Sequence, residues 1–494
     1  MPNLLAPVAL LLWIPLGLAL FAVYRPPVAA SAAIIGASLL LPCGYGFKII
    51  GFPELDRELI ASLAALIGCV VFAPQRLRGR HPGQGADLLA IVVVLGAFGT
   101  TLTNRDPVGD APALRTYDAF STAFREVLRF WLPFFLGRAL FRSPSELRPL
   151  LVFLTAAALL YSIPIFWEAR MSPGLHLAVY GFLPASFQYQ MRAGGFRPMV
   201  FVGHGLALAM FVLSATVASI GLARVQPKAF GVKTSWIATY LFGVLVICRS
   251  AAALVYGVVV APLLFLVRAS IQARVILVVA VIVISYPVLR GLDWFPTASF
   301  VDIARAFSED RANSLDFRFV NEDALLERAR ERIWFGWGGW GRNTTQLETI
   351  YGRPITDGFW IILLGQQGVV GYLGAFGLLL VPAAMAARRV GRMPPSRDAL
   401  LLTTTSWIVV LNTVDLLPNG FLTARAIFVA GALAGALQGS RAAASRGKPR
   451  EATHRPDPRR PPVLLSEGGR RRVSGPANAL RDAEQHRRPH GEHR

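Results

Sequence analysis

Apolar runs long enough to cross the roughly 30 Å of hydrocarbon in a bilayer recur along most of this chain. In lipid every backbone polar group needs a partner within the protein, so such runs must form helices. The residues do not alternate with the period of two that strands of a membrane barrel display. Hydrophobic residues make up 54% of the sequence and charged residues only 16%, which is too apolar for an ordinary soluble globule. The sequence therefore predicts an all-α polytopic integral membrane protein.

The apolar runs define the candidate membrane spans. Several are short, and an upright helix needs roughly 17 residues to cross, so we expect about 12 to 13 transmembrane helices. The first run carries no basic segment before it and is expected to be a retained span rather than a cleaved signal. The candidate spans are Leu4–Val23, Val28–Ile50, Leu59–Phe72, Leu88–Thr103, Phe120–Phe141, Leu150–Trp167, Met199–Leu222, Trp236–Ile247, Ala251–Val267, Val275–Val288, Phe359–Met385, Leu400–Leu416 and Phe421–Leu437.

The basic residues between the spans predict the orientation, because Lys and Arg in short loops favour the cytoplasmic side. The segments placed outside are longer and of mixed charge, and the scheme is self-consistent from Leu59 to Leu437. The basic, cytoplasmic segments are Gln75–Arg80, Arg142–Arg148, Arg224–Lys233, Arg268–Arg274 and Arg388–Arg397. The outside segments are Arg105–Asp118, Glu168–Pro198, the turn at Arg249 and the long loop Leu292–Thr356.

Two domains follow from this pattern, a transmembrane domain over residues 1–439 and a tail over residues 440–494. The tail is rich in Arg, Pro, Gly, Ser and His, a composition typical of disorder. It supplies much of the formal net charge of +21. We expect a cytoplasmic tail that lies near anionic lipid headgroups and binds no nucleic acid, since no aromatic interleaving or folded module accompanies the charge.

The sequence contains no pattern typical of a metal site or a disulfide. Cys43, Cys69 and Cys248 lie in or beside apolar segments without metal-ligand or disulfide spacing, and we interpret them as small packing residues. No Asp-x-Asp pair or acidic cluster with metal-site spacing lies in the outside segments. This absence is consistent with cation supply by arginine, and we expect neither metal nor cofactor in the site.

Arginines gather at the predicted outer face. Arg192 and Arg197 precede one span, and Arg249 stands at the tip of a short hairpin. Ionisable residues at such depths are costly unless they pair or line a wet cavity. Guanidinium groups suit a diphosphate, because the planar fork binds phosphate oxygens in a bidentate way and stays charged. The other candidates for binding substrate here are Arg125, Arg129 and His204. The alternatives are that the arginines anchor the chain at headgroups and that His204 is a packing residue.

The long outer loop carries the remaining candidate residues. Leu315–Trp334 has helical periodicity, which predicts either a helix on the interface or a lid with Arg318 pointing into a cavity. A glycine–tryptophan motif, Phe335–Gly341, follows, and Arg342 after it is a further candidate for substrate binding. Asp357 precedes the next span, where it is either a helix N-cap or a base for a sugar hydroxyl.

Three of these patterns together resemble the O-antigen ligase and polymerase superfamily of bacterial membrane proteins. The first is Arg192-Ala-Gly-Gly-Phe before a span, and the second is Arg249-Ser250 in a hairpin. The third runs from Arg318 through Phe335-Gly-Trp-Gly to the span start Thr356-Asp-Gly-Phe-Trp and its Gly-Val-Val-Gly371. The chain departs from the family pattern where Asp357 replaces a histidine and Cys248 replaces a serine. It is most similar to exopolysaccharide polymerase-like members.

The resemblance implies metal-independent glycosyl transfer at the periplasmic face of the bacterial inner membrane. The donor would be an oligosaccharide on a polyprenyl diphosphate, and the acceptor a second lipid-linked sugar unit. Arg192, Arg249 and Arg318 would bind the diphosphate, while Asp357 would orient or deprotonate the acceptor hydroxyl. Other polysaccharide-assembly proteins are candidate partners.

Two alternatives to this activity stay open on the sequence. One is a membrane transporter for an anionic solute, in which the same arginines would form the binding site. Transporters favour sites at mid-membrane and often contain inverted repeats, whereas these arginines cluster at one face and no clear repeat is present. The other is a structural scaffold for a polysaccharide-assembly complex.

Overall fold

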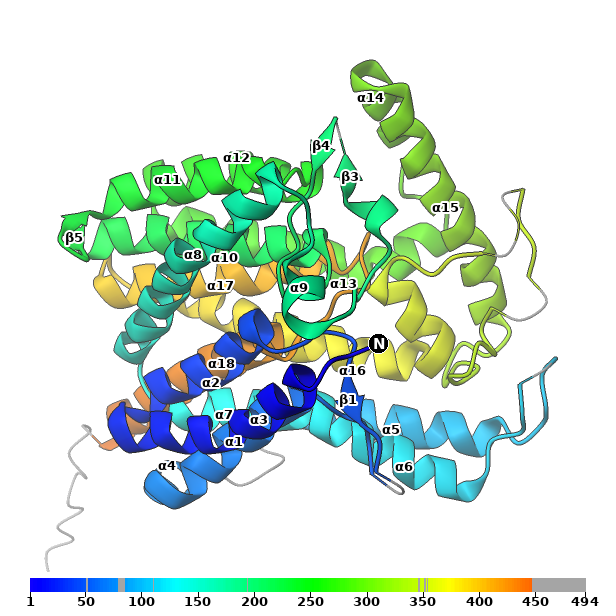
Figure 1. Cartoon of the computed structure of the whole chain (residues 1–494), viewed down its shortest axis with the longest axis horizontal. Coiled ribbons are helices and arrows are strands. Elements are labelled where there is room, and N and C mark those ends of the chain that lie inside the picture. Colours follow the sequence, from blue (N-terminus) through cyan, green and yellow to red (C-terminus); the bar gives the residue numbers. More distant parts are fainter. Residues whose placement is uncertain are drawn as a thin grey trace, which may run out of the picture. The chain divides into compact units, whose positions relative to one another are not determined.

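The computed structural model describes residues 1–49, 52–78, 85–109, 111–192, 194–344, 347–350, 352 and 354–446. Helices dominate these residues, and three two-stranded antiparallel hairpins lie between them (Figure 1). The hairpins are β1 (Gly46–Phe47) with β2 (Leu55–Asp56), β3 (Met191–Arg192) with β4 (Gly195–Phe196), and β5 (Lys228–Ala229) with β6 (Val232–Lys233). The all-α prediction is confirmed.

A helix occupies each of the thirteen candidate spans. These helices are α1 (Leu5–Val23), α2 (Pro26–Leu40), α3 (Arg57–Phe72), α5 (Asp87–Thr103), α6 (Thr116–Glu126) continuing through η1 (Val127–Trp131) into α7 (Leu132–Leu140), α8 (Leu147–Arg170), α10 (Gly205–Val225), α11 (Thr234–Ile247), α12 (Ala251–Leu266), α13 (Ala269–Gly291), α16 (Phe359–Val390), α17 (Arg397–Asp415) and α18 (Ala424–Arg446). The shorter elements between them are α4 (Pro74–Leu77), η2 (Pro144–Glu146), α9 (Leu175–Tyr180), η3 (Phe187–Gln190), α14 (Thr297–Phe307) and α15 (Glu309–Arg330).

The chain is a polytopic membrane protein by the length and composition of its helices. Among the described residues, five helical segments are long and apolar enough to cross a bilayer, and five further apolar helices are shorter. The five long segments are Leu5–Val23, Pro144–Arg170, Gly205–Val225, Ala269–Gly291 and Phe359–Val390. The number of crossings, 12 to 13, stays a prediction.

Two span boundaries differ from the prediction because turn residues end the helices. Helix α2 ends at Leu40 rather than near residue 50, since Pro42 has no N–H to continue a helix and Gly44 has a positive φ of 75°. Helix α10 begins at Gly205 rather than at Met199, because Gly203, with a φ of 96°, turns the chain before the helix.

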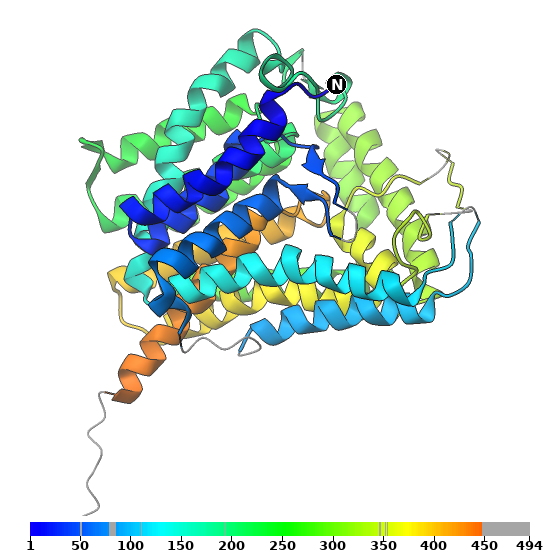
Figure 2. The same cartoon turned by 60° about the horizontal axis from the view of Figure 1, so that its bottom comes forward.

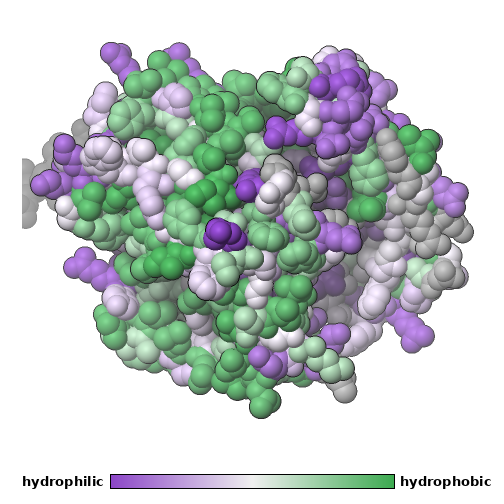
Figure 3. All heavy atoms as spheres, turned by 45° about the horizontal axis from the view of Figure 1, so that its top comes forward, coloured by the Kyte–Doolittle hydropathy of each residue, from purple (hydrophilic) through white to green (hydrophobic). Residues whose placement is uncertain are grey.

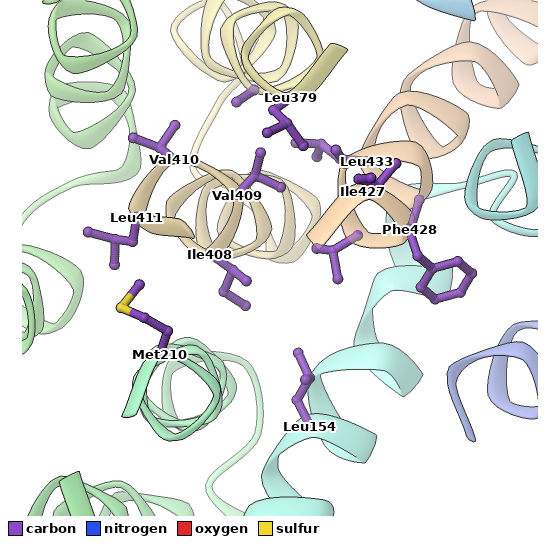
Figure 4. Close-up of a cluster of buried hydrophobic side chains, with 14 of the residues drawn as sticks. Leu154, Met210, Leu379, Ile408, Val409, Val410, Leu411, Ile427, Phe428 and Leu433 are labelled. Carbon is purple, nitrogen blue, oxygen red and sulfur yellow. The ribbon is translucent and has the colours of Figure 1, made fainter. Parts of the chain in front are cut away.

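The interior of the bundle is built around α10, α16 and α17. Figure 4 shows apolar side chains from these helices, α8 and α18 meeting in one cluster, for example Met210, Leu379, Ile408 and Phe428. Helices α1 and α13 are peripheral, with only 28% and 33% of their apolar windows buried. Their outward apolar side chains are the surface that a bilayer would cover, and Figure 3 shows such side chains spread over much of one face of the molecule.

The basic loops gather at one end of the helices. Arg76 pairs with Glu146 at 2.9 Å, and Arg142 donates to the carbonyls of Gln75 and Arg76. Arg148 donates to Gln226, which joins a further basic loop to this end. The predicted outside segments meet at the other end, where α14, α15 and the β3–β4 hairpin lie (Figure 1). The structure thus separates the two sets of loops as the charge pattern predicts.

Two helices of the bundle are interrupted. The π-helical turn Val127–Trp131 joins α6 to α7, and Figure 2 shows the resulting long cyan helix, which packs on α5. Helix α16 breaks at Gly368, whose φ of 65° and ψ of −166° are not helical. A break inside a span is tolerated only where other groups of the protein satisfy the freed backbone.

Helices α7 and α18 pack through glycines. A Cβ at Gly431 would fall on the carbonyl oxygen of Phe134, one at Gly137 on that of Phe428, and one at Gly435 on that of Arg138. Small residues allow two backbones to approach closely, which is how helices associate in lipid.

We predict that Gly431→Ala destabilises the bundle, because the methyl group has no room between α7 and α18. Overpacking costs about 1–3 kcal/mol, so the thermal midpoint in detergent should fall by several degrees. Gly243→Ala is the matched control, since a Cβ at this position in α11 meets nothing within 4 Å. Size-exclusion chromatography after heating measures both variants, and equal midpoints would contradict the prediction.

Candidate functional site

The β3–β4 hairpin and the α11–α12 turn bring two of the predicted arginines together. Arg249 has a left-handed φ of 48°, which turns the chain between the two helices. Its guanidinium lies against Gly195, where a Cβ would clash with it. Arg197 donates through Nε and Nη2 to the Arg249 carbonyl, at 3.3 and 3.1 Å. The backbone of Arg192 pairs with Gly195 in the hairpin, but its side chain lies outside the described part of the structure.

Arg318 and Asp357 form the second pair of predicted residues that the structure joins. Arg318 Nε lies 3.3 Å from Asp357 Oδ2, with side chains 29% and 39% exposed. Arg318 therefore reaches from α15 to the residue before Gly358, the N-cap of α16. Gly358 is the N-cap of this helix and Asp357 lies one residue before it, so the N-cap alternative for Asp357 is wrong. Its carboxylate is partly open to solvent and held by a guanidinium.

A further acid lies near this ion pair. Asp415 ends α17 and interacts electrostatically with Arg318, as does Tyr256 of α12. Asn419 donates to an Asp415 carboxylate oxygen at 2.9 Å. The Phe359 amide donates to the carbonyls of Leu416 and Asn419, which fixes the start of α16 on the α17–α18 connection. Sequence reasoning missed Asp415, although an acid at the outer end of a predicted span was a usable signal.

His204 stands at the same end of the bundle as the N-cap of α10. Its Nδ1 accepts a hydrogen bond from the Leu206 N–H at 3.2 Å, and its ring stacks on Phe421 at 4.4 Å between centroids. Phe421 follows Gly420, where a Cβ would lie 3.2 Å from the Asp357 carbonyl. The α17–α18 connection therefore links the histidine to the Arg318–Asp357 pair.

Arg125 and Arg129 lie in different surroundings. The Arg125 side chain is 56% exposed and contacts the buried Glu126 at 3.4 Å. The Arg129 guanidinium lies 5.8 Å from the centre of the Phe359 ring, at the start of α16. Arg129 thus approaches the segment that carries Asp357, whereas the ion-pair contact of Arg125 is with its neighbour Glu126.

Arg342 is fully buried and joins two loops. Its Nε donates to the Trp337 carbonyl at 2.9 Å, Nη1 to Pro112 at 2.8 Å and Nη2 to Asp106 at 2.7 Å. Backbone carbonyl oxygens thus accept hydrogen bonds from all three guanidinium nitrogens. A structural role accounts for these contacts, and they give no support to the prediction that Arg342 binds substrate.

The glycine–tryptophan motif fills the break in α16. The left-handed Gly336, with a φ of 67°, lies so close to Gln366 and Gln367 that no side chain would fit. Four hydrogen bonds then replace those that the helix loses. They run from Trp337 N–H to Gly365, from Gly338 N–H to Gln366, from Val369 N–H to Ile333 and from Val370 N–H to Trp334, at 2.8, 3.0, 2.8 and 3.3 Å.

A buried polar cluster fixes the middle of α15 to the bundle. Trp360 Nε1 donates to Glu322 Oε1 at 3.1 Å, and the Tyr286 hydroxyl donates to Oε2 at 3.4 Å. Arg290 Nε lies 3.5 Å from the same Oε2, and its Nη2 donates to Asp323 at 2.7 Å. Sequence reasoning missed this cluster. The available signal was a carboxylate three residues after Phe319, on the apolar side of the predicted helix.

These observations define the chain as an all-α polytopic membrane protein with its candidate residues at one end. No family model matches the chain, and no curated protein matches it. The resemblance to the O-antigen ligase and polymerase superfamily therefore stays a prediction.

We predict that Glu322 makes the stability of the protein depend on pH. Burial, opposed by the Trp360 hydrogen bond and the charge of Arg290, raises the pKa of Glu322 from an ordinary 4.5 to about 7. The folded state therefore holds the proton more tightly than the unfolded state. This stabilisation is complete below about pH 4.5 and is lost as the pH rises through 7.

Glu322→Gln mimics the protonated side chain and isolates this effect. The thermal midpoint of the variant should equal that of the wild type near pH 5 and should lie several degrees higher than that of the wild type at pH 8. Thermal midpoints of both proteins across this range give the measurement, with Glu327→Gln on the same helix as the control. A constant difference between Glu322→Gln and wild type would contradict the assignment.

Proposed function

We propose that the protein is a membrane glycosyltransferase of the O-antigen ligase or polymerase type. It transfers a glycan from a polyprenyl-diphosphate donor to an acceptor sugar at the periplasmic face of the bacterial inner membrane. The observation that carries the proposal is the presence of Arg249 and the Arg318–Asp357 pair at the end of the bundle opposite the basic loops. The positive-inside bias assigns the basic end to the cytoplasm, so these residues face the periplasm.

The donor diphosphate is the group that the arginines would hold. During transfer the bond between the anomeric carbon of the donor sugar and the diphosphate oxygen breaks, and that oxygen gains negative charge. Arg249 is half-buried, and Arg318 is 29% exposed in its side chain, so both positions weaken competition from water. Preorganised guanidinium groups in such a setting stabilise a developing anion. Arg192 is the third arginine of this proposal.

Asp357 is the group that would act on the acceptor. The acceptor hydroxyl forms the new bond to the anomeric carbon and loses its proton, which a carboxylate within reach can accept. Without substrate, the guanidinium of Arg318 holds this carboxylate. A diphosphate would compete for Arg318 and thereby release Asp357 as a base. Donor binding and acceptor activation would then be coupled through one ion pair.

The transporter alternative draws on one observation, the break in α16. Broken helices in transporters use their freed backbone groups to bind ions or substrates. Here the loop residues 333–338 form hydrogen bonds with the carbonyls of Gly365 and Gln366 and with the amides of Val369 and Val370. Because the loop already satisfies these backbone groups, the break has a structural role rather than a binding role. The glycosyltransferase is therefore the better-supported function.

We predict that Arg249→Ala and Arg318→Ala each lower transfer while the protein still inserts and folds. The loss of one hydrogen bond to a charged group costs about 1.5–3 kcal/mol, equivalent to a rate reduction of about 10- to 100-fold. Purified protein is mixed with a lipid-linked oligosaccharide, and product length is measured. Arg148→Ala, at the basic end, is the matched control. Wild-type product from both test variants would overturn the arginine assignment.

We predict that Asp357→Asn separates binding from chemistry. The amide keeps the size of the side chain but cannot accept the proton, so turnover should fall by about 100- to 10,000-fold. Donor binding, measured by isothermal titration with the lipid-linked oligosaccharide, should be as tight as in wild type or tighter, because the amide no longer competes for Arg318. Unchanged turnover would exclude Asp357 as the base.

A further inference from the structure

Helix α14 carries an apolar stripe that is largely exposed among the described residues. Phe300, Ile303 and Phe307 are 45%, 59% and 78% exposed, and their spacing places them on one side of the helix. Asp302 and Arg305 lie on the opposite side and pair at 2.7 Å. Such a division of apolar and charged residues is typical of a helix that lies in the plane of a membrane interface.

Stacked rings fix the position of α14 relative to the bundle. Phe300 stacks on Phe295 with 5.1 Å between centroids and an angle of 2° between the ring planes. Phe295 contacts Tyr286 of α13 edge to face at 5.1 Å, and Tyr286 contacts Trp360 of α16 at 5.0 Å. The stripe therefore begins where α13 leaves the bundle, and these ring contacts connect α14 to α13 and α16.

The apolar surface of α13 continues into the stripe. Val281 and Val288 of α13 are 62% and 58% exposed, as expected for side chains that face lipid. Beyond the helix, Leu292 is 52% and Trp294 is 71% exposed, and the stripe of α14 follows. Tryptophan is enriched where the hydrocarbon core meets the headgroups, so Trp294 marks this level.

We propose that the apolar face of α14 is immersed in the outer leaflet of the bilayer, at the headgroup boundary beside α13. The occupant of the face is membrane lipid, because the stripe is continuous with a surface that lipid already covers. Asp302 and Arg305 then face water. Because α15 follows α14 directly, this contact holds Arg318 close to the membrane surface. The proposal concerns lipid contact alone and does not depend on the proposed activity.

Spin labels can test the immersion of α14. Cys43, Cys69 and Cys248 are replaced by alanine, and a single cysteine is introduced at Ile303, at Phe307 or, as the matched control, at Asp302. The labelled protein is placed in nanodiscs of phosphatidylethanolamine and phosphatidylglycerol. Accessibility to oxygen, which concentrates in lipid, is compared with accessibility to a water-soluble nickel chelate.

At residues 303 and 307, oxygen should collide with the label several-fold more often than the nickel chelate, and at residue 302 the order should reverse. Equal access of the nickel chelate to residues 303 and 302 would place the face in water and overturn the proposal. Exclusion of both reagents from residue 303 would show that protein, such as a second copy of the chain, covers the face, and would overturn the proposal as well.

A measurement on the unmodified chain guards against variants that fail to fold. A phospholipid with a diazirine in its acyl chain is photolysed with the wild-type protein in nanodiscs. Trypsin then releases residues 291–305, which lie between Arg290 and Arg305 and contain Trp294, Phe300 and Ile303. Labelling of this peptide that fragmentation maps to Phe300 or Ile303 supports immersion. The absence of label from Phe300 and Ile303, when the peptide that spans residues 275–290 is labelled, contradicts immersion.

Discussion

An interrupted helix in hydrocarbon leaves amides and carbonyls without partners, and each such group costs several kcal/mol unless the protein supplies one. Helix α16 is interrupted at Gly368, and backbone from the outer loop supplies the partners. The loop enters between α5 and α16, where Thr100 donates to the Phe335 carbonyl and Asn104 to that of Gly336. The break and the loop are therefore joined by backbone hydrogen bonds, and the loop supplies the partners that the break requires.

The consequence for the site is that the long outer loop is part of the bundle. Its end is fixed in the α16 break, and its middle is fixed where Glu322 meets Tyr286, Arg290 and Trp360. Arg318 lies one helical turn before Glu322, so the anchor that holds the carboxylate also positions the guanidinium. The electrostatic pairing with Asp357 is thereby set by packing, which is how a site acquires a defined geometry.

The sequence was most informative where the physics is simplest. Apolar runs must become helices in lipid, so the spans were predictable, and basic loops gathered at one end as the charge pattern required. Boundaries failed at Pro42 and Gly203, where turn residues outweigh apolar character. Arg318 and Asp357 were both predicted as site residues, but their contact was not, because no local pattern fixes the register between a loop helix and the next span.

The same limit explains the two residues whose surroundings were not foreseen. Arg342 is buried because carbonyls far away in the chain surround its guanidinium, and a sequence does not reveal which carbonyls a fold brings together. Glu322 is buried because Trp360 and Tyr286 come from two different spans. The sequence analysis did not single out Glu322, and helical periodicity could not have named its partners.

The π-helical turn Val127–Trp131 gives one span two independently oriented halves. Each residue advances an α-helix by about 100°, so the extra residue in this turn sets the azimuth of α6 apart from that of α7. Loss of one residue there would restore a regular helix and rotate Glu126 out of the interior, while α7 kept its seam of glycine contacts with α18. A single-codon deletion or insertion in this turn could thus re-aim the outer half of the span without disturbing the inner half.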